Sequence, residues 1–356
     1  MTLVMTLLAR DEADVIESWL SYHLNAGADF VVATDNRSQD GTTAVLERYE
    51  REGHVHLIRE VGEDLRQDEW VTRMARLAAT EFGADWVINS DADEFWWPRG
   101  ASLAHVLEAI PPRYGTVGAF LRTFAPRPES AEPFAERLTV RFSALAPIND
   151  PASLFKPIRK VIHRGHSEVR LTRGNHALVD SPFDLLRGWF PVEVFHFPLR
   201  SLAQCAHKAR LQGSAWKHIA RTPTAYHAQM FEALETGTMA QYYEAQIVSD
   251  SEVERGVQSG RLVVDTRLRD ALRRLGAGET RLEFPTPTLV DEATYAVEAA
   301  ALGEADVVRL QRRLDVLERR LAAIELRLPN RIYRKLTRPV KRVLGRDSVG
   351  EQGEGR

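Results

Sequence analysis

The sequence contains a single cysteine and no long apolar run. Cys205 is the only cysteine among 356 residues, which excludes an internal disulfide framework and a zinc site built from several cysteines. No stretch of 18 apolar residues occurs and no secretory leader pattern is seen, so we expect neither a membrane-spanning helix nor export. We therefore expect the protein in the cytoplasm, including peripherally on the inner face of the membrane.

The charge balance is almost neutral overall but uneven along the chain. The 47 Lys and Arg residues and 50 Asp and Glu residues give a formal net charge of -3, with 44% hydrophobic residues typical of a globular protein. Residues 329–356 hold eight basic and three acidic side chains. Because the basic charge is confined to this terminus without interleaved aromatic residues, the composition argues against a nucleic-acid partner.

The first hundred residues alternate between short apolar runs and amphipathic stretches. This alternation is typical of βαβ units around a mainly parallel sheet, and it predicts a doubly wound, Rossmann-like α/β fold. The expected strands lie at 3–9, 29–35, 54–60 and 84–91, and the expected helices at 12–26, 41–53 and 67–82.

The remainder of the chain divides by composition. We expect one domain over 1–240, a helical extension over 241–302, a coiled-coil-like helix over 303–328 and a basic, partly disordered tail over 329–356. A heptad pattern of leucines predicts homo-oligomer formation through 307–328, or packing of this helix on its own domain.

The tail carries apolar residues spaced three to four apart among basic ones. Such a pattern in 331–346 predicts peripheral contact with an anionic membrane. The alternative is a solvated basic end, since Pro339 would interrupt a continuous helix.

Acidic residues gather where the fourth expected strand ends. Asp91, Asp93 and Glu94 follow a buried-type run within NSDADEFWWP, and ligands of open α/β sheets bind outside the carboxyl ends of the strands. Neighbouring carboxylates can share one Mn²⁺ or Mg²⁺ ion, whose open positions phosphate oxygens readily fill. An isolated D-x-D motif is also common as a solvated acidic turn.

Polar loops follow the first two strands as well. Arg10 and Glu12 end the first strand, and Asp35 and Asp40 flank the turn after the second. The second loop has a structural alternative, because such residues also form turns and helix N-caps. Three loops are thus expected at one sheet edge.

The ordered series of these segments resembles family 2-type glycosyltransferases of the GT-A fold. The segments that carry the resemblance are LLARDEADVIESWLSYHLNAGAD, ATDNRSQDGT, RQDEWVTRMARLA and WVINSDADEFWWP. The resemblance implies a nucleotide-diphosphate-sugar donor, a Mn²⁺ or Mg²⁺ cofactor and a role in polysaccharide biosynthesis. It implies Asp35 at the base or ribose, Asp91 at the ribose or a metal-bound water, and Asp93 on the metal. Asn36 stands where the family often has a second aspartate, which leaves the base selectivity open.

The resemblance also implies a histidine ligand from the second half of the domain. His196, Arg200 and Lys208 match a metal ligand followed by basic residues that face the diphosphate, and His176 is the second candidate ligand. Either histidine could instead be a hydrogen-bonded core residue.

The remaining roles rest on weaker signals. Arg10 and Arg73 are candidate diphosphate contacts, and an inverting hexosyltransferase needs a carboxylate base, for which Asp180 is the first choice and Glu168 the second. Trp96 and Trp97 are candidates for stacking against the sugar or acceptor, with core packing as the alternative.

We therefore expect a metal-dependent, inverting glycosyltransferase that acts on a glycan or lipid-linked acceptor. A nucleotidyltransferase of similar fold is the second enzyme reading, although its usual Gly-rich basic loop is replaced here by ARDEADV. A noncatalytic sugar-binding scaffold with a coiled coil is the third.

Overall fold

The structure is a computed structural model that describes residues 1–62, 66–143, 158–179, 181–216 and 225–325. It contains two units, Met1–Leu302 and Gly303–Arg356. Asp180 and the whole tail, including 331–346, therefore lie outside the described residues. None of the described helices combines the length and the apolar character needed to cross a membrane.

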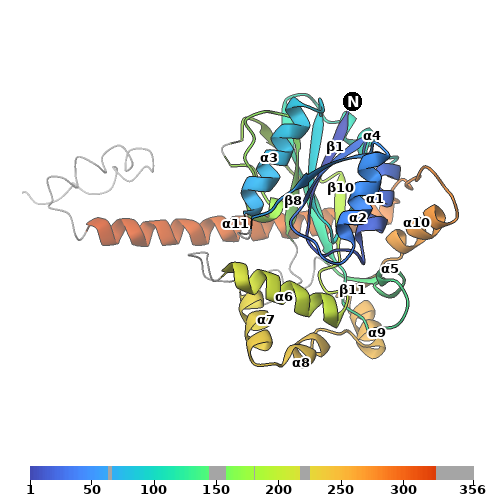
Figure 1. The fold of residues 1–356 in the computed structure, drawn as a ribbon. Helices are drawn as coiled ribbons and strands as arrows, with labels where there is room; N and C mark the ends of the chain where they lie inside the picture. Colours follow the sequence, from blue (N-terminus) through green and yellow to red (C-terminus); the bar gives the residue numbers. More distant parts are fainter. Residues whose placement is uncertain (63–65, 144–157, 180, 217–224, 326–356) are drawn as a thin grey trace, which may run out of the picture. The chain divides into compact units, whose positions relative to one another are not determined.

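A nine-stranded mixed sheet forms the centre of the first unit (Figure 1). Its order is β3-β2-β1-β4-β8-β6-β10-β5, with β9 paired to β6. The strands are β1 Leu3–Ala9, β2 Phe30–Asp35, β3 Val55–Arg59, β4 Trp86–Asp91, β5 Glu94–Pro98, β6 Tyr114–Thr123, β8 Arg159–Arg164, β9 Asp184–Leu186 and β10 Val192–His196. A separate pair is β7 Val140–Phe142 with β11 Leu262–Val264.

Helices alternate with the strands in the first half of the chain and make up most of what the structure describes of the second half. They are α1 Ile16–Asn25, α2 Thr42–Arg51, α3 Gln67–Thr80, α4 Leu103–Glu108, α5 Phe134–Arg137, α6 Leu202–Trp216, α7 Ala225–Glu235, α8 Met239–Glu244, α9 Asp250–Gln258, α10 Arg267–Gly276 and α11 Leu289–Glu325, with a 3₁₀ turn η1 at Arg173–Asn175. Residues 241–302 belong to the same compact unit as the predicted domain, because β11 pairs with β7.

The predicted α/β fold is confirmed, and the four predicted N-terminal strands are β1 to β4. They pair in parallel as β3-β2-β1-β4, whereas β8 runs antiparallel to both β4 and β6. The mainly parallel arrangement follows from the helical crossovers between these strands.

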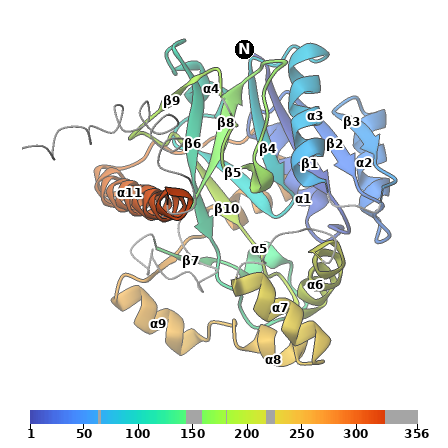
Figure 2. The same ribbon diagram turned by 90° about the vertical axis from the view of Figure 1, so that its left-hand side faces the viewer.

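Both faces of the parallel strands are buried, which explains their continuous apolar runs. Successive side chains of β1 point to opposite faces. Leu3 and Met5 pack in the cluster that contains Trp19 of α1, and Val4 packs in the cluster that contains Met74 of α3. Helices α1 and α3 therefore cover opposite faces of the sheet (Figure 2).

The pairing of β10 with β5 brings two distant segments into register. These strands are antiparallel, with His196 opposite Glu94, and the backbone N–H of Phe197 donates to the carbonyl of Asp93 at 2.9 Å. This pairing places the end of β10 beside the turn that follows β4.

The second unit contributes the end of α11. Of the predicted oligomer segment 307–328, residues 307–325 are described and helical. The side chains of Leu314, Leu317 and Leu321 are exposed, and oligomer formation through this segment stays a prediction.

A buried ion network fastens the start of α11 to the sheet. Glu193 of β10 lies between Arg122 of β6 and Arg267 of α10, each with an N–O distance of 2.7 Å. Arg122 also contacts Glu298 of α11 at 2.5 Å. Burial alone would raise the pKa of Glu193, but Arg122, then Arg267 and Arg141, hold it well below its usual value.

We predict that Glu193→Gln lowers the free energy of unfolding by about 3 kcal/mol at pH 7, because it breaks a buried ion pair. Since the folded pKa is depressed, the contribution of Glu193 is present above its unfolded pKa of about 4.3 and is lost as pH falls through the folded value. The difference between wild type and variant in urea unfolding should therefore shrink in acid. Glu279→Gln, which breaks an exposed pair with Arg274, should change stability by less than about 0.5 kcal/mol; equal effects of both substitutions would contradict the prediction.

Candidate active site

A cavity of about 220 Å³ opens beyond the carboxyl ends of β1 and β4. Two helices complete it, α3 through Trp70 and α6 through Leu211. Six residues singled out in the sequence line it together, namely Arg10, Glu12, Asp91, Asp93, His196 and Lys208. The expected convergence of loops at one sheet edge therefore occurs for these six.

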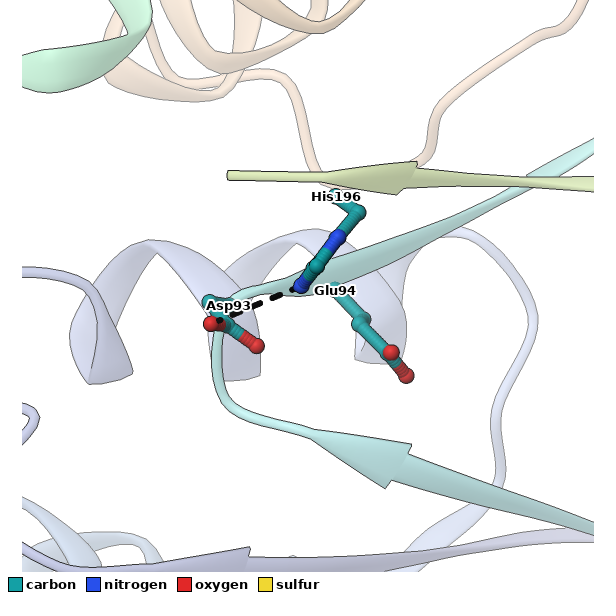
Figure 3. A group of neighbouring side chains, drawn as sticks. All are labelled: Asp93, Glu94 and His196. Atoms are coloured by element: carbon teal, nitrogen blue, oxygen red, sulfur yellow. Dashed lines mark ion pairs between the residues drawn. The ribbon is translucent and has the colours of Figure 1, made fainter. Parts of the chain in front are cut away.

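The turn between β4 and β5 places the acidic residues. Asp91 ends β4 and Glu94 begins β5, so Asp93 lies at the tip of a tight reversal. The side chains of Asp93 and Glu94 are almost fully buried. Asp93, Glu94 and His196 each offer one ligand atom, and these atoms lie within 4.8 Å of one another (Figure 3).

The imidazole of His196 is oriented toward Asp93 without a hydrogen bond to it. Its Nε2 is 3.7 Å from an oxygen of Asp93 (Figure 3), and its buried Nδ1 has no hydrogen-bond partner. Burial lowers the pKa of His196 to about 4, against the opposing effect of Asp93. The ring is therefore neutral near pH 7, the state in which histidine binds metals.

Asp93 is surrounded by positive charge from α6 and the residues before it. Lys208 Nζ donates to Asp93 Oδ2 at 2.8 Å, and Arg200 Nη1 lies 4.0 Å from the same oxygen. Burial alone would raise the pKa of Asp93, but Lys208 above all, with His196 and Arg200, holds it well below the usual range. Asp93 is therefore ionised near pH 7.

Lys160, which the sequence analysis did not single out, neutralises the other two acids. Its Nζ lies 3.0 Å from Asp91 Oδ2 and 2.6 Å from Glu94 Oε1. Burial raises the pKa of Glu94 to about 8 although Lys160 lowers it. A lysine directly before the apolar pair Val161 and Ile162 of β8 was the signal available in the sequence, because buried lysines are almost always paired.

The buried Arg200 holds a second group of charges beside the cavity. It contacts Glu12 at 2.5 Å and Asp14 at 2.6 Å. Burial raises the pKa of Glu12 to about 7, with Arg200 acting in the opposite direction. The guanidinium predicted to face a diphosphate is thus committed to carboxylates of the first loop, and it fixes that loop against the start of α6.

Asp11 and His207 form a further pair at the cavity, which sequence reasoning also missed. His207 Nε2 lies 2.7 Å from Asp11 Oδ2. Asp11 has φ of 55°, a left-handed conformation that is uncommon for a residue other than glycine. Its other carboxylate oxygen accepts from the backbone N–H of Gln39 at 2.6 Å, so this residue joins the first two loops.

The second acidic loop holds itself together instead of lining the cavity. Asp35 accepts hydrogen bonds from the hydroxyls of Ser38 and Thr43, and Asp40 accepts from the backbone and hydroxyl of Thr42 at the start of α2. Neither aspartate lines the described cavity. The turn and helix-start alternative therefore describes both, because a short side chain near a helix N-terminus finds unpaired N–H groups there.

Trp96 and Trp97 belong to the core, which corrects their expected role in sugar stacking. Their exposed fractions are 0% and 6%. Trp96 Nε1 donates to Ser90, and the ring of Trp97 stacks on Phe195 with centroids 5.4 Å apart. β5 is the edge strand next to β10, and its tryptophans are buried because side chains such as Tyr22 of α1 and Phe284 pack against them.

Several other residues predicted for the site lie away from the cavity in the structure or outside the described residues. Arg73 pairs with Glu60 on the surface of α3 at 2.9 Å. The Nδ1 of His176 lies 2.9 Å from the carbonyl oxygen of Arg159, so His176 is not among the three clustered ligands. Glu168 is exposed in a loop, and Asp180 lies outside the described residues. Sequence distance alone could not show which of these side chains the sheet would bring to one edge.

The donor set of the cluster fits a divalent cation. Asp93 offers a carboxylate oxygen, Glu94 offers one once it loses its proton, and His196 presents the Nε2 of a neutral imidazole. These are the oxygen and nitrogen ligands that Mn²⁺ accepts and that Mg²⁺ accepts in part. Asp93, Glu94 and His196 would hold the ion, and Asp91 lies at the edge of the same cavity.

Residues 5–164 match the model of glycosyltransferase family 92. The matched segment is just under half of the chain and includes β1 to β6 and β8, and with them Arg10, Glu12, Asp91 and Asp93. The match supports a glycosyltransferase, and it is not to the family 2 type that the motifs resemble. Comparison with curated proteins gives no match.

Solved structures resemble the chain only distantly. TarS from S. aureus has 12% sequence identity and a TM-score of 0.30, over 66% of this chain and 43% of that one. Glucosyl-3-phosphoglycerate synthase from Mycobacterium tuberculosis, in complex with Mn²⁺, UDP and glucosyl-3-phosphoglycerate, has 19% identity and a TM-score of 0.27, over 46% and 56%. The chain thus spans about half the length of these two structures, and at this similarity neither establishes a shared activity.

We predict that Lys160→Met lowers the free energy of unfolding by about 3 kcal/mol, because it removes the buried ammonium group that pairs with Asp91 and contacts Glu94. Urea unfolding followed by circular dichroism measures the change. Arg73→Met removes the same charge from a half-exposed surface pair and should change stability by at most about 0.5 kcal/mol. If Lys160→Met is as stable as Arg73→Met, Lys160 does not compensate the acidic cluster.

Proposed function

We propose that this protein is a divalent-cation-dependent hexosyltransferase that moves a sugar from a nucleoside-diphosphate donor to a glycan or lipid-linked acceptor, with inversion at the anomeric carbon. The observation that carries the proposal is the group formed by Asp93, Glu94 and His196, of which Asp93 and His196 line a cavity that also presents Lys208 and Arg10. The family match supports the transferase class.

The chemistry of sugar transfer explains why such a cavity is needed. As the bond between the anomeric carbon and the diphosphate breaks, negative charge develops on the leaving phosphate. A cation held by Asp93, Glu94 and His196 would stabilise that charge as a Lewis acid.

The protein's own cations supply further stabilisation of the leaving group. Arg10 lines the cavity, and its buried Nε has no hydrogen-bond partner. Its Nη1 donates to Asn36 at 3.1 Å, which fixes the guanidinium beside the first two loops. Positive groups held in place before the reaction stabilise developing charge without the cost of reorganisation.

The first loop disfavours the nucleotidyltransferase alternative. Asp11, Glu12 and Asp14 make it acidic, and their carboxylates are used to hold His207 and Arg200. No Gly-rich phosphate loop follows β1 in the sequence.

We predict that Mn²⁺ together with a matching nucleoside diphosphate raises the melting temperature of the protein, because both bind only the native state. A thermal-shift screen of UDP, GDP, ADP, CDP and dTDP with and without Mn²⁺ measures this, and the matching nucleotide sugar then serves in a hydrolysis assay. Asp93→Asn should abolish the Mn²⁺-dependent shift and lower donor hydrolysis by at least about 100-fold, in line with the loss of a major electrostatic group.

Glu254→Gln serves as the matched control, because this exposed carboxylate lies on α9 and should leave both readouts unchanged. Absence of any nucleotide-dependent shift in the wild type, or full hydrolysis by Asp93→Asn, would overturn the proposed function. The configuration of the product, read by proton NMR, tests inversion separately.

A further inference from the structure

The two lysines at the acidic cluster differ in how firmly they are held. Lys160 lies within β8, its side chain is 4% exposed, and it contacts two carboxylates at once. The side chain of Lys208 is 27% exposed and makes its close contact with Asp93 alone. Lys160 is therefore a fixed part of the core, whereas Lys208 has one ion-pair contact to lose and room to move.

The contact made by Lys208 uses the oxygen that a cation would need. Oδ2 of Asp93 accepts from Lys208 at 2.8 Å and is also the oxygen nearest to His196 Nε2, at 3.7 Å. An ion held between Asp93 and His196 would compete with the ammonium group for that oxygen. Two positive charges a few Å apart in a buried site repel strongly, and Lys208, with one ion-pair contact and partial exposure, is the neighbouring cation with room to move away from the ion.

The position of Lys208 on α6 gives it somewhere to go. Gln204, His207, Lys208 and Leu211 occupy positions i, i+3, i+4 and i+7 of α6 and line the same cavity, as expected of one face of a helix. The lysine side chain has four rotatable bonds and binds phosphate as a mobile point charge. A diphosphate in the cavity would offer its ammonium group a new partner without moving the helix.

We infer that Lys208 is an internal counter-ion that holds Asp93 until a nucleoside diphosphate draws its ammonium group away, so that the divalent cation and the nucleoside diphosphate bind cooperatively. This inference rests on the proposed function and adds a regulatory role for one residue of the same site. A ligand that removes a competitor from a second ligand's site increases the affinity of that second ligand, and the effect is reciprocal.

The test measures Mn²⁺ affinity by the electron paramagnetic resonance signal of the free ion, with and without UDP, and with GDP as the second probe. In the wild type we expect the nucleotide to raise Mn²⁺ affinity by about tenfold or more, within the usual range of coupling between sites. In Lys208→Met, Mn²⁺ should bind about tenfold more tightly in the absence of nucleotide, the nucleotide should bind more weakly, and the coupling should fall by a similar factor.

Three further variants make the result specific. Lys208→Arg retains a positive side chain beside the Asp93 carboxylate and should keep the weak Mn²⁺ binding of the wild type. Lys208→Gln removes that charge and should behave like Lys208→Met. Arg73→Met removes a positive charge from α3 without touching Asp93 and should leave Mn²⁺ affinity unchanged. Circular dichroism of each variant verifies folding, and Lys208→Gln replaces Lys208→Met in the comparison if the latter does not fold.

The outcomes separate the inference from the proposed function. A wild-type protein that binds neither Mn²⁺ nor a nucleotide overturns the proposed function and this inference with it. A wild-type protein that binds both, while Lys208→Met and Lys208→Gln leave Mn²⁺ affinity unchanged or weaker, overturns the inference alone.

Discussion

Buried negative charge at the end of β4 must be compensated before the rest of the site can form. Asp93 and Glu94 are almost fully enclosed, and an isolated carboxylate in such surroundings costs several kcal/mol. The compensation comes from Lys160 and Lys208, which lie far along the chain on β8 and α6. The acidic turn after β4 therefore depends for its stability on lysines from later in the chain.

The compensation divides the cluster into a fixed and an exchangeable half. Glu94 is paired to a lysine within the sheet, and the in-register pairing of β10 with β5 holds His196 opposite it. Asp93 is paired to a lysine at the cavity surface. A site built this way keeps its geometry through the core while one carboxylate stays able to change partner, which suits a site that takes up a charged ligand.

Local patterns predicted the first four strands and their helices, because both faces of a parallel sheet are buried and the apolar runs record it. They also placed Arg10, Glu12, Asp91 and Asp93 correctly at one edge, since the ends of parallel strands coincide. The same patterns failed for Trp96 and Trp97, whose position after an acidic turn looked exposed. Trp97 is covered by Phe195 of β10 and by Phe284, residues about one hundred and nearly two hundred positions later.

The sequence by itself determined the α/β class, the acidic turn after β4 and the resemblance to glycosyltransferases, because these depend on residues close together in the chain. Only the tertiary structure decided that His196 reaches Asp93 while His176 does not, that Lys160 and Lys208 neutralise the cluster, and that Arg200 pairs with Glu12. Contacts between distant segments depend on strand pairing and register, which the order of residues within each segment does not specify.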